Sequence, residues 1–324
     1  MKIAVVGCGA VGSYYGALLR RAGEEVHFLL RSDYSVVRQS GVHIQSPRGD
    51  FTAHPRAAAG PEEIGPSDLV VIALKTTANA AFPRLLPPLV GPHTGLLTLQ
   101  NGLGNEEQLA QLFPGHRIFG GLCFVCVNRI APGVIQHLDH GLIMMGELGR
   151  PPTPQLREVV ARFQRAEIVC RVADDLARAH WEKLVWNIPF NGLGVASAAG
   201  DAALDGGHAP RAAAQPCRTT DRLLDGGLWE ARVRALMLEV IAVAHALGHH
   251  LDAALVETMI RRTRTMGPYK PSTVLDFEHG RPLELESLFL APQRQAQIAG
   301  VRTPHLTALC RCLRRLDGAT PAAR

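Results

Sequence analysis

The chain has 324 residues, of which 47% are hydrophobic, which is enough for a sizeable core and suggests two domains. The formal net charge is +5, but Lys and Arg are scattered, which argues against a nucleic-acid-binding protein and suits a protein with anionic ligands. Because there is no apolar run of about 18 residues and no long apolar segment after the first Met, we predict a cytoplasmic protein without membrane helices.

The first half of the chain alternates short apolar runs with helix-like segments. The predicted strands are KIAVVG, EEVHFLL, SDLVVIALK and GLLTLQ, and helices are predicted at 11–22 and 106–113. Shorter strand-like pieces follow in GVIQHLD and GLIMMGE, then a helix near 153–166 and the strand EIVCRV. This alternation predicts an α/β domain with a Rossmann-like doubly wound sheet, which we end at residue 174.

The second half, 175–324, lacks this alternation and is predicted to be a mainly helical domain. The segment 199–218, rich in Ala, Gly and Pro, is interpreted as an insertion or mobile loop. The predicted helices lie at about 175–198, 228–248, 252–266, 284–299 and 303–316.

A glycine motif, Gly7-x-Gly9-x-x-Gly12, directly follows the first predicted strand and opens a helix. In this position the first Gly makes a tight turn, the second lets the backbone approach a pyrophosphate, and the third allows close helix–strand packing. The helix N-terminus then binds the anion. The motif predicts a dinucleotide site; the other interpretation is a tight turn without a ligand.

The end of the second predicted strand bears on the choice between NAD and NADP. An NAD site places a carboxylate there for the ribose 2′-hydroxyl, whereas this sequence has Arg31, which can pair with a 2′-phosphate. NADP(H) is therefore favoured. Two alternatives stay open: Asp33 takes the acidic position if the register shifts by two, or Arg31 is only a solvated charge.

Cysteine and lysine usage narrows the candidate chemistry. The seven Cys are scattered, and Cys123-x-x-Cys126 has no second pair at zinc-site spacing, so we predict neither a disulfide framework nor a metal site. Only four of the 34 Lys and Arg residues are Lys. Since Lys presents a compact ammonium whose pKa shifts readily, each one is a candidate for chemistry. Lys2 is the weakest of these candidates, and Lys75 stands at the carboxyl end of a predicted strand, where open α/β sheets bind ligands.

The segment WEKLVWNIPFN places Lys183, Asn187 and Asn191 on one stripe of a mostly apolar helix. Burying one cation and two amides is costly unless a polar ligand satisfies them. An amphipathic helix with Lys183 reaching to water is the alternative. Pro189, within the stripe, removes a hydrogen bond to the Val185 carbonyl and should kink or end the helix.

Taken together, five ordered motifs resemble those of the ketopantoate reductases (2-dehydropantoate 2-reductases), over nearly the whole chain. The motifs are GCGAVGSYYG, ALKT, LQNGLGN, WEKLVWNIPFNGL and KPSTVLDFEHGRPLELESL. The resemblance implies a Rossmann-like domain, a helical substrate and dimerisation domain, and a cleft between them. It also implies NADPH-dependent reduction of 2-dehydropantoate to (R)-pantoate, a step of pantothenate biosynthesis, and a possible homodimer.

The resemblance also implies the roles of particular residues. Lys183 would be the general acid, and Glu284, the second catalytic residue, would lie by the substrate hydroxyl, Lys183 or the nicotinamide ribose. Substrate would be bound by Asn101, Lys183, Asn187, Asn191 and Ser272. Cofactor would be bound by Gly7, Cys8, Gly9, Ala10, Val11, Gly12, Arg31, Lys75, Asn101 and Glu284.

From the residues alone, other interpretations of the C-terminal pair stay open. Glu284 could serve only a helix dipole, and Ser272 could be only a turn residue after Pro271. The segment CFVCVNR and Gly192 depart from the pattern of many family members. These departures bear on the identity of the 2-oxo acid, so one alternative is a related NADPH-dependent reductase of another small 2-oxo acid. The second alternative is a non-catalytic NADP(H)-binding sensor, against which the intact set of Lys183, Asn187, Ser272 and Glu284 argues.

Overall fold

The computed structural model describes residues 1–205 and 215–317, which include most of two compact units, Met1–Ala179 and His180–Arg324. The division falls five residues after the position that the sequence suggested. The central part of the predicted insertion, 206–214, lies outside the described residues. No helix in the described part of the chain is long and apolar enough to cross a membrane.

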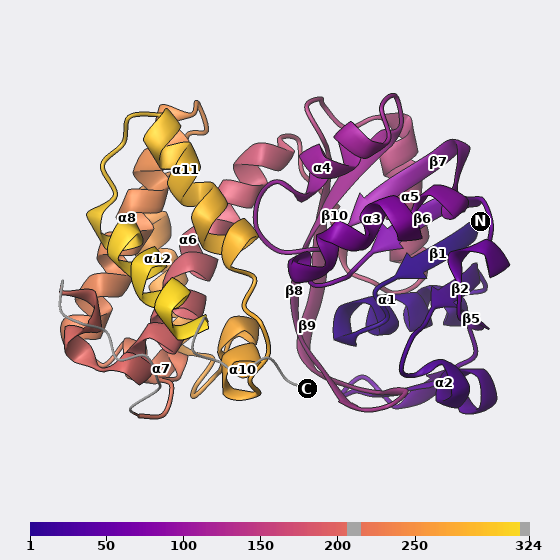
Figure 1. Cartoon of the computed structure of the whole chain (residues 1–324), viewed down its shortest axis with the longest axis horizontal. Helices are drawn as coiled ribbons and strands as arrows, with labels where there is room; N and C mark the ends of the chain where they lie inside the picture. Colours follow the sequence, from indigo (N-terminus) through magenta and orange to yellow (C-terminus); the bar gives the residue numbers. More distant parts are fainter. Residues whose placement is uncertain (206–214, 318–324) are drawn as a thin grey trace. The chain divides into compact units, whose positions relative to one another are not determined.

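The first unit is built on a mixed sheet that has ten strands in the residues described (Figure 1). The main path runs β4-β3-β9-β8-β7-β6-β1-β2-β5, and β10 pairs with β9. The strands are β1 (Lys2–Val6), β2 (Glu25–Leu29), β3 (Val42–Gln45), β4 (Phe51–Ala53), β5 (Arg56–Ala58), β6 (Ser67–Ile72), β7 (Val90–Thr98), β8 (Arg117–Ala131), β9 (Val134–Glu147) and β10 (Cys170–Val172). The helices are α1 (Ala10–Arg21), α2 (Tyr34–Ser40), α3 (Phe82–Leu85), α4 (Asn105–Leu112) and α5 (Pro154–Arg165).

Six neighbouring strands, β5-β2-β1-β6-β7-β8, are parallel to one another. Numbered by their order along the chain, they have the order 3-2-1-4-5-6 of a dinucleotide-binding Rossmann fold. The strand order reverses between β1 and β6, and ligands bind such sheets outside the carboxyl ends of the strands at this point. The predicted doubly wound fold is therefore confirmed.

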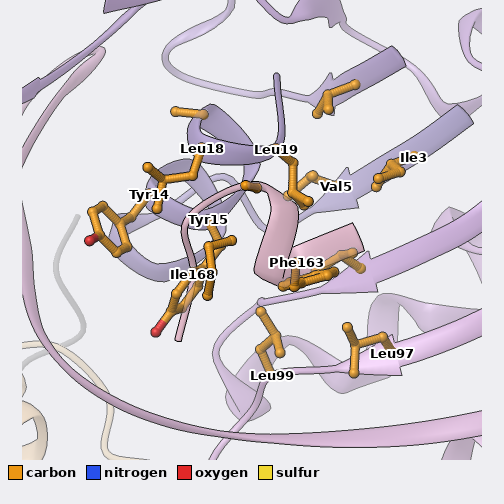
Figure 2. Packing of buried hydrophobic residues seen from close by; sticks show 14 of the residues in the cluster. Ile3, Val5, Tyr14, Tyr15, Leu18, Leu19, Leu97, Leu99, Phe163 and Ile168 are labelled. Atoms are coloured by element: carbon orange, nitrogen blue, oxygen red, sulfur yellow. The ribbon is translucent and has the colours of Figure 1, made fainter. Parts of the chain in front are cut away.

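Successive residues of the central strands face two separate hydrophobic cores. On β1, Ile3 and Val5 belong to one core, and Ala4 and Val6 belong to the other. The first core is filled by side chains of α1 and α5 (Figure 2), and the second by side chains of α3 and α4. The near-continuous apolar runs of β1 and β6 follow from this burial on both faces. The helix residues facing the first core include Tyr15, Leu18, Leu19 and Phe163, and those facing the second include Phe82 and Leu109.

A long antiparallel hairpin of β8 and β9 extends the parallel strands. The two short pieces predicted at 133–139 and 141–147 form one strand, β9. Its register against β8 shifts between Phe124 and Val125, where Gly141 has no direct partner, and His140 and Gly141 have φ values of 66° and 118°. This β-bulge interrupts the alternation of side chains, which explains why the sequence indicates two pieces.

The second unit is helical. The long helix α6 (Leu176–Ala196) begins just before the division between the units. The elements that follow are α7 (Thr220–Leu223), α8 (Leu228–Ala246), α9 (Leu255–Arg264), α10 (Ser272–Glu278), a π-helical turn (Glu286–Leu290), α11 (Ala291–Ile298) and α12 (Pro304–Asp317).

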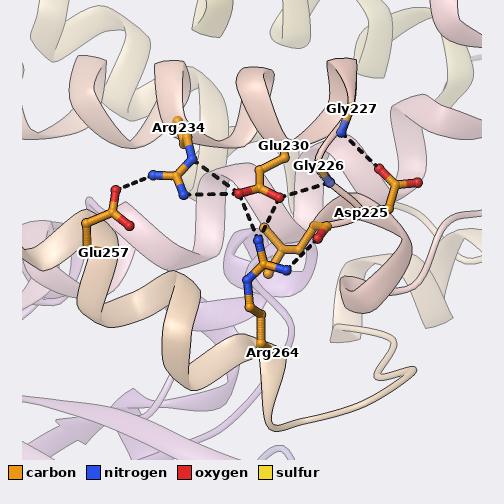
Figure 3. A network of polar contacts seen from close by, with 8 residues as sticks. Asp225, Gly226, Gly227, Glu230, Arg234, Glu257 and Arg264 are labelled. Carbon is orange, nitrogen blue, oxygen red and sulfur yellow. Dashed lines mark hydrogen bonds and ion pairs between the residues drawn. The ribbon is translucent and has the colours of Figure 1, made fainter.

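One buried carboxylate, that of Glu230 on α8, organises part of this unit (Figure 3). It accepts hydrogen bonds from Arg234, from Arg264 of α9 and from the backbone N–H of Gly226. Burial alone would raise the pKa of Glu230, but the hydrogen bonds from the two arginines hold it below its ordinary value. The network ties α8, α9 and the loop before α8 together.

Helix α6 does not end at Pro189, contrary to that part of the sequence prediction. A proline inside a helix costs about 3 kcal/mol. Val185, Ile188 and Phe190 around it are fully buried, and burying each such side chain contributes about 1.5–3 kcal/mol. Packing therefore outweighs the lost hydrogen bond, and the helix continues to Ala196.

Gly192 on α6 allows close packing of other segments of this unit. A Cβ at this position would lie 2.6 Å from Cδ2 of Leu309 and 2.8 Å from Cε1 of Phe289. We expect Gly192→Ala to lower the free energy of unfolding by up to about 2 kcal/mol, because overpacking costs about 1–3 kcal/mol and the gain in helix propensity offsets only about 1 kcal/mol of this. Denaturant unfolding of Gly192→Ala, of Leu309→Ala and of the double variant measures this. If the effect is overpacking, Gly192→Ala costs less in the Leu309→Ala background.

Candidate active site

The glycine turn lies at the carboxyl end of β1, beside the end of β6. Gly7 has a φ of 101°, and a Cβ there would lie 2.3 Å from the backbone N of Leu74. A Cβ on Gly12 would lie 2.3 Å from the Gly7 carbonyl oxygen. By contrast, a Cβ on Gly9 would have nothing within 4 Å. Two glycines are thus required by packing, and the exposed Gly9 leaves its backbone open to a ligand.

The N-terminus of α1 is suited to a phosphate. Its N-cap residue, Gly9, makes no side-chain cap, and the first turn contains no acidic residue. Ser13 Oγ donates a hydrogen bond to the Cys8 carbonyl at 3.0 Å, which stabilises the turn. Backbone N–H groups and the positive end of the helix dipole favour an anion at this position. These residues therefore fit a dinucleotide pyrophosphate.

In the segment after β2, the side chains of Arg31 and Asp33 have different environments. Arg31 is exposed and makes no hydrogen bond or ion pair with the described residues. Asp33 is buried, with 6% of its surface exposed. Its carboxylate pairs with Arg129 of β8 and accepts from the backbone N of Gly133 at 3.0 Å and from Ser32 Oγ at 2.8 Å. The hydrogen bonds from Arg129 lead the causes that hold the pKa of Asp33 below its ordinary value.

Lys75 and Asn101 lie in the loops after β6 and β7, at the same edge of the sheet as the glycine turn. The buried Gln100 connects these loops, because its Nε2 donates to the Leu74 carbonyl at 3.0 Å and to Asn79 Oδ1 at 2.7 Å. Asn105 Nδ2 donates to the Asn101 carbonyl at 3.2 Å. This amide network, which local sequence patterns do not predict, fixes the backbone on which Lys75 and Asn101 stand.

In the second unit, α6 holds Lys183, Asn187 and Asn191 on one continuous stripe. Lys183 is half-buried, and the two asparagines are 7% and 4% exposed. Asn191 Oδ1 accepts a hydrogen bond of 3.1 Å from the backbone N of Thr273, in the first turn of α10. Asn191 therefore has a structural role, and it brings the start of α10 beside α6.

Ser272 and Glu284 flank this part of the helical unit. Ser272 is the exposed first residue of α10, which makes its hydroxyl accessible. Glu284 is 3% exposed and precedes the π-helical turn, a geometry frequent at functional sites. Phe289 of that turn packs against α6 at Gly192. The structure thus brings Thr273, the neighbour of Ser272, to Asn191 and the segment after Glu284 to the same helix.

Lys2 and Lys270 have identifiable structural contacts. Lys2 donates to the carbonyls of Ile64 and Pro66, and Lys270 pairs with Glu278 at 2.8 Å. Lys75 and Lys183 lie in the two segments described above. Across residues 1–205 and 215–317, no group of three or more His, Cys, Asp or Glu side chains could hold a metal ion.

The strand order and the glycine turn define a Rossmann-type dinucleotide-binding protein. The model of the family "Ketopantoate reductase PanE/ApbA" matches residues 3–150, and that of its C-terminal domain matches residues 208–317. The chain belongs to the ketopantoate reductase family and is an oxidoreductase. Family membership supports a nicotinamide cofactor.

Individual relatives match this chain over nearly its full length. A 2-dehydropantoate 2-reductase of Nostoc sp. is 40% identical over 98% of this chain and 95% of its own. The crystal structure of a 2-dehydropantoate 2-reductase from Geobacter metallireducens has a TM-score of 0.88 at 45% identity, covering 97% of this chain and 99% of its own. D-mandelate dehydrogenase, solved with NADH and anilino(oxo)acetate, has a TM-score of 0.83 at 20% identity over 98% of this chain and 99% of its own. The last likeness shows the fold alone.

Proposed function

We propose that the chain is an NADPH-dependent 2-dehydropantoate 2-reductase that forms (R)-pantoate for pantothenate biosynthesis. The observation that carries the proposal is the stripe of α6, where Lys183 precedes two buried asparagines in a chain of this family. A buried amide needs polar partners, and a small hydroxylated 2-oxo acid offers a carboxylate, a ketone and a hydroxyl.

Bound NADPH supplies the hydride for the ketone carbon. The ammonium of Lys183 hydrogen-bonds the ketone oxygen and gives it a proton as negative charge develops there, which leaves a neutral amine and the alcohol product. Asn187, Asn191 and Ser272 bind the substrate's carboxylate and hydroxyl. Glu284 is the second catalytic residue and lies by the substrate hydroxyl, Lys183 or the nicotinamide ribose.

In the nucleotide site, the glycine turn binds the pyrophosphate and Arg31 pairs with the 2′-phosphate. Lys75 and Asn101 line the cofactor, and Asn101 also contacts the substrate. The exposure of Arg31 supports NADPH, because its guanidinium is available for a new ion pair, whereas Asp33 already has its partners.

The alternative is an NADPH-dependent reductase of another small 2-oxo acid. D-mandelate dehydrogenase, which by its name acts on a different 2-hydroxy acid, has the same fold, so the fold alone does not decide between the two substrates. The unusual Gly192 gives this alternative no support, because its packing against Leu309 and Phe289 accounts for it.

A panel of 2-oxo acids assayed with NADPH and with NADH tests the proposal. We expect the highest kcat/KM for ketopantoate with NADPH. A rate with ketopantoate no higher than with unrelated 2-oxo acids would remove the substrate assignment. Binding of NADPH without turnover of any 2-oxo acid would point to a sensor instead.

A further inference from the structure

The carboxylate of Asp33 is saturated by contacts from the β8–β9 hairpin and from its own loop. Arg129 Nε donates to Oδ2 at 2.8 Å, and its Nη2 pairs with Oδ1. The backbone N of Gly133, in the turn of the hairpin, also donates to Oδ2, and Ser32 Oγ donates to Oδ1. Each oxygen therefore accepts two hydrogen bonds, and the carboxylate has little capacity left for a ligand.

Asp33 also stands close in the chain to the position where NAD-binding folds place an acidic residue. β2 ends at Leu29, and Asp33 follows by four residues, two after Arg31. A carboxylate near the ribose attracts a 2′-hydroxyl and repels a 2′-phosphate. An uncompensated Asp33 would therefore oppose the function proposed for Arg31.

We infer that Arg129 is a specificity-determining positioning residue, which withholds the Asp33 carboxylate from the ribose 2′ position and so favours NADPH over NADH. The inference rests on the proposed use of NADPH. With Arg129 present, the charges of Arg31, Asp33 and Arg129 sum to +1 next to the expected phosphate, and without it they sum to zero. Since Arg129 comes from a strand 96 residues further along the chain, the hairpin also fixes the loop that carries Arg31.

Binding measurements on the protein without substrate test this inference. Dissociation constants of NADP⁺ and NAD⁺ would be measured by calorimetry for the wild type, Arg129→Met, Asp33→Asn and the double variant, with the melting temperature of each. We expect the ratio of Kd for NAD⁺ to Kd for NADP⁺ to fall about tenfold in Arg129→Met, the effect of about one lost charge contact. In the double variant, where no carboxylate is exposed, most of the ratio should return.

The double variant separates electrostatics from simple damage to the loop, because loop damage would persist in it. Arg129→Lys keeps the positive charge but loses the two-point pairing with the Asp33 carboxylate, so it should give an intermediate ratio of the two dissociation constants. This variant replaces Arg129→Met in the test if Arg129→Met does not fold. A ratio unchanged in Arg129→Met, or equally low in the double variant, overturns the inference. If the wild type binds NAD⁺ more tightly than NADP⁺, the proposed cofactor is wrong, and the inference fails with it. The ratio of the two dissociation constants of the wild type identifies this outcome without any variant.

Discussion

Replacing Lys183 by alanine should lower kcat by about 10²–10⁴-fold, the usual contribution of a positioned general acid. The affinity for NADPH should change little, because the glycine turn and Arg31 belong to the first unit and Lys183 to the second. The fold should persist, because Lys183 is only half-buried and its neighbours Leu184 and Val185 supply the buried surface of α6. Steady-state kinetics with ketopantoate and NADPH titration measure the two effects.

Lys183→Arg is the matched control for charge. A guanidinium keeps the positive charge but is a poor proton donor near neutral pH, so this variant should recover little activity. Near-wild-type turnover in Lys183→Arg would mean that the residue acts only as a cation, and the role of general acid would be wrong. A comparable loss of NADPH affinity in both variants would instead indicate a structural defect.

Much of the fold could be predicted because its central strands follow simple local rules. Short apolar runs predict parallel strands buried on both faces, and β1 and β6 have this form. The strands β3, β4 and β5 were not predicted, because they have only three or four residues, too few for a period to show. The bulge at Gly141 and the continuation of α6 through Pro189 depend on long-range pairing and packing, which local patterns do not contain.

The features of the candidate site also differ in whether a local sequence pattern predicts them. The glycine turn and the Lys183 stripe are periodic features of one segment, so the sequence indicates them. Pairs that join distant segments left no local signal: Arg129 with Asp33 across 96 residues, and Asn191 with Thr273 across 82. From the sequence alone, either Arg31 or Asp33 could stand at the position that faces the ribose 2′ group. The hydrogen bonds of Asp33 give the physical reason to favour Arg31.

Reversing the charge of Arg31 should distinguish the two cofactors sharply. In Arg31→Asp, an attraction to the 2′-phosphate is replaced by a repulsion, and such a change costs several kcal/mol, with each 1.4 kcal/mol worth tenfold in affinity. We expect NADPH to bind about 10²–10³-fold more weakly. NADH, which has no 2′-phosphate, should bind about as well as before or slightly better. Titration of both cofactors measures the difference.

Arg38 of α2 provides a matched control for Arg31. It is also exposed, and its guanidinium lies 5.9 Å from the Tyr34 ring centroid. Arg38→Asp makes the same change in net charge seven residues away, so it tests whether NADPH responds to a local ion pair or to the general field of the protein. A general field would weaken NADPH in both variants and would be screened by salt within about 10 Å at 0.1 M. Equal loss of NADPH and NADH in Arg31→Asp would show that Arg31 supports the loop after β2, and the choice between the cofactors would then have to come from other residues.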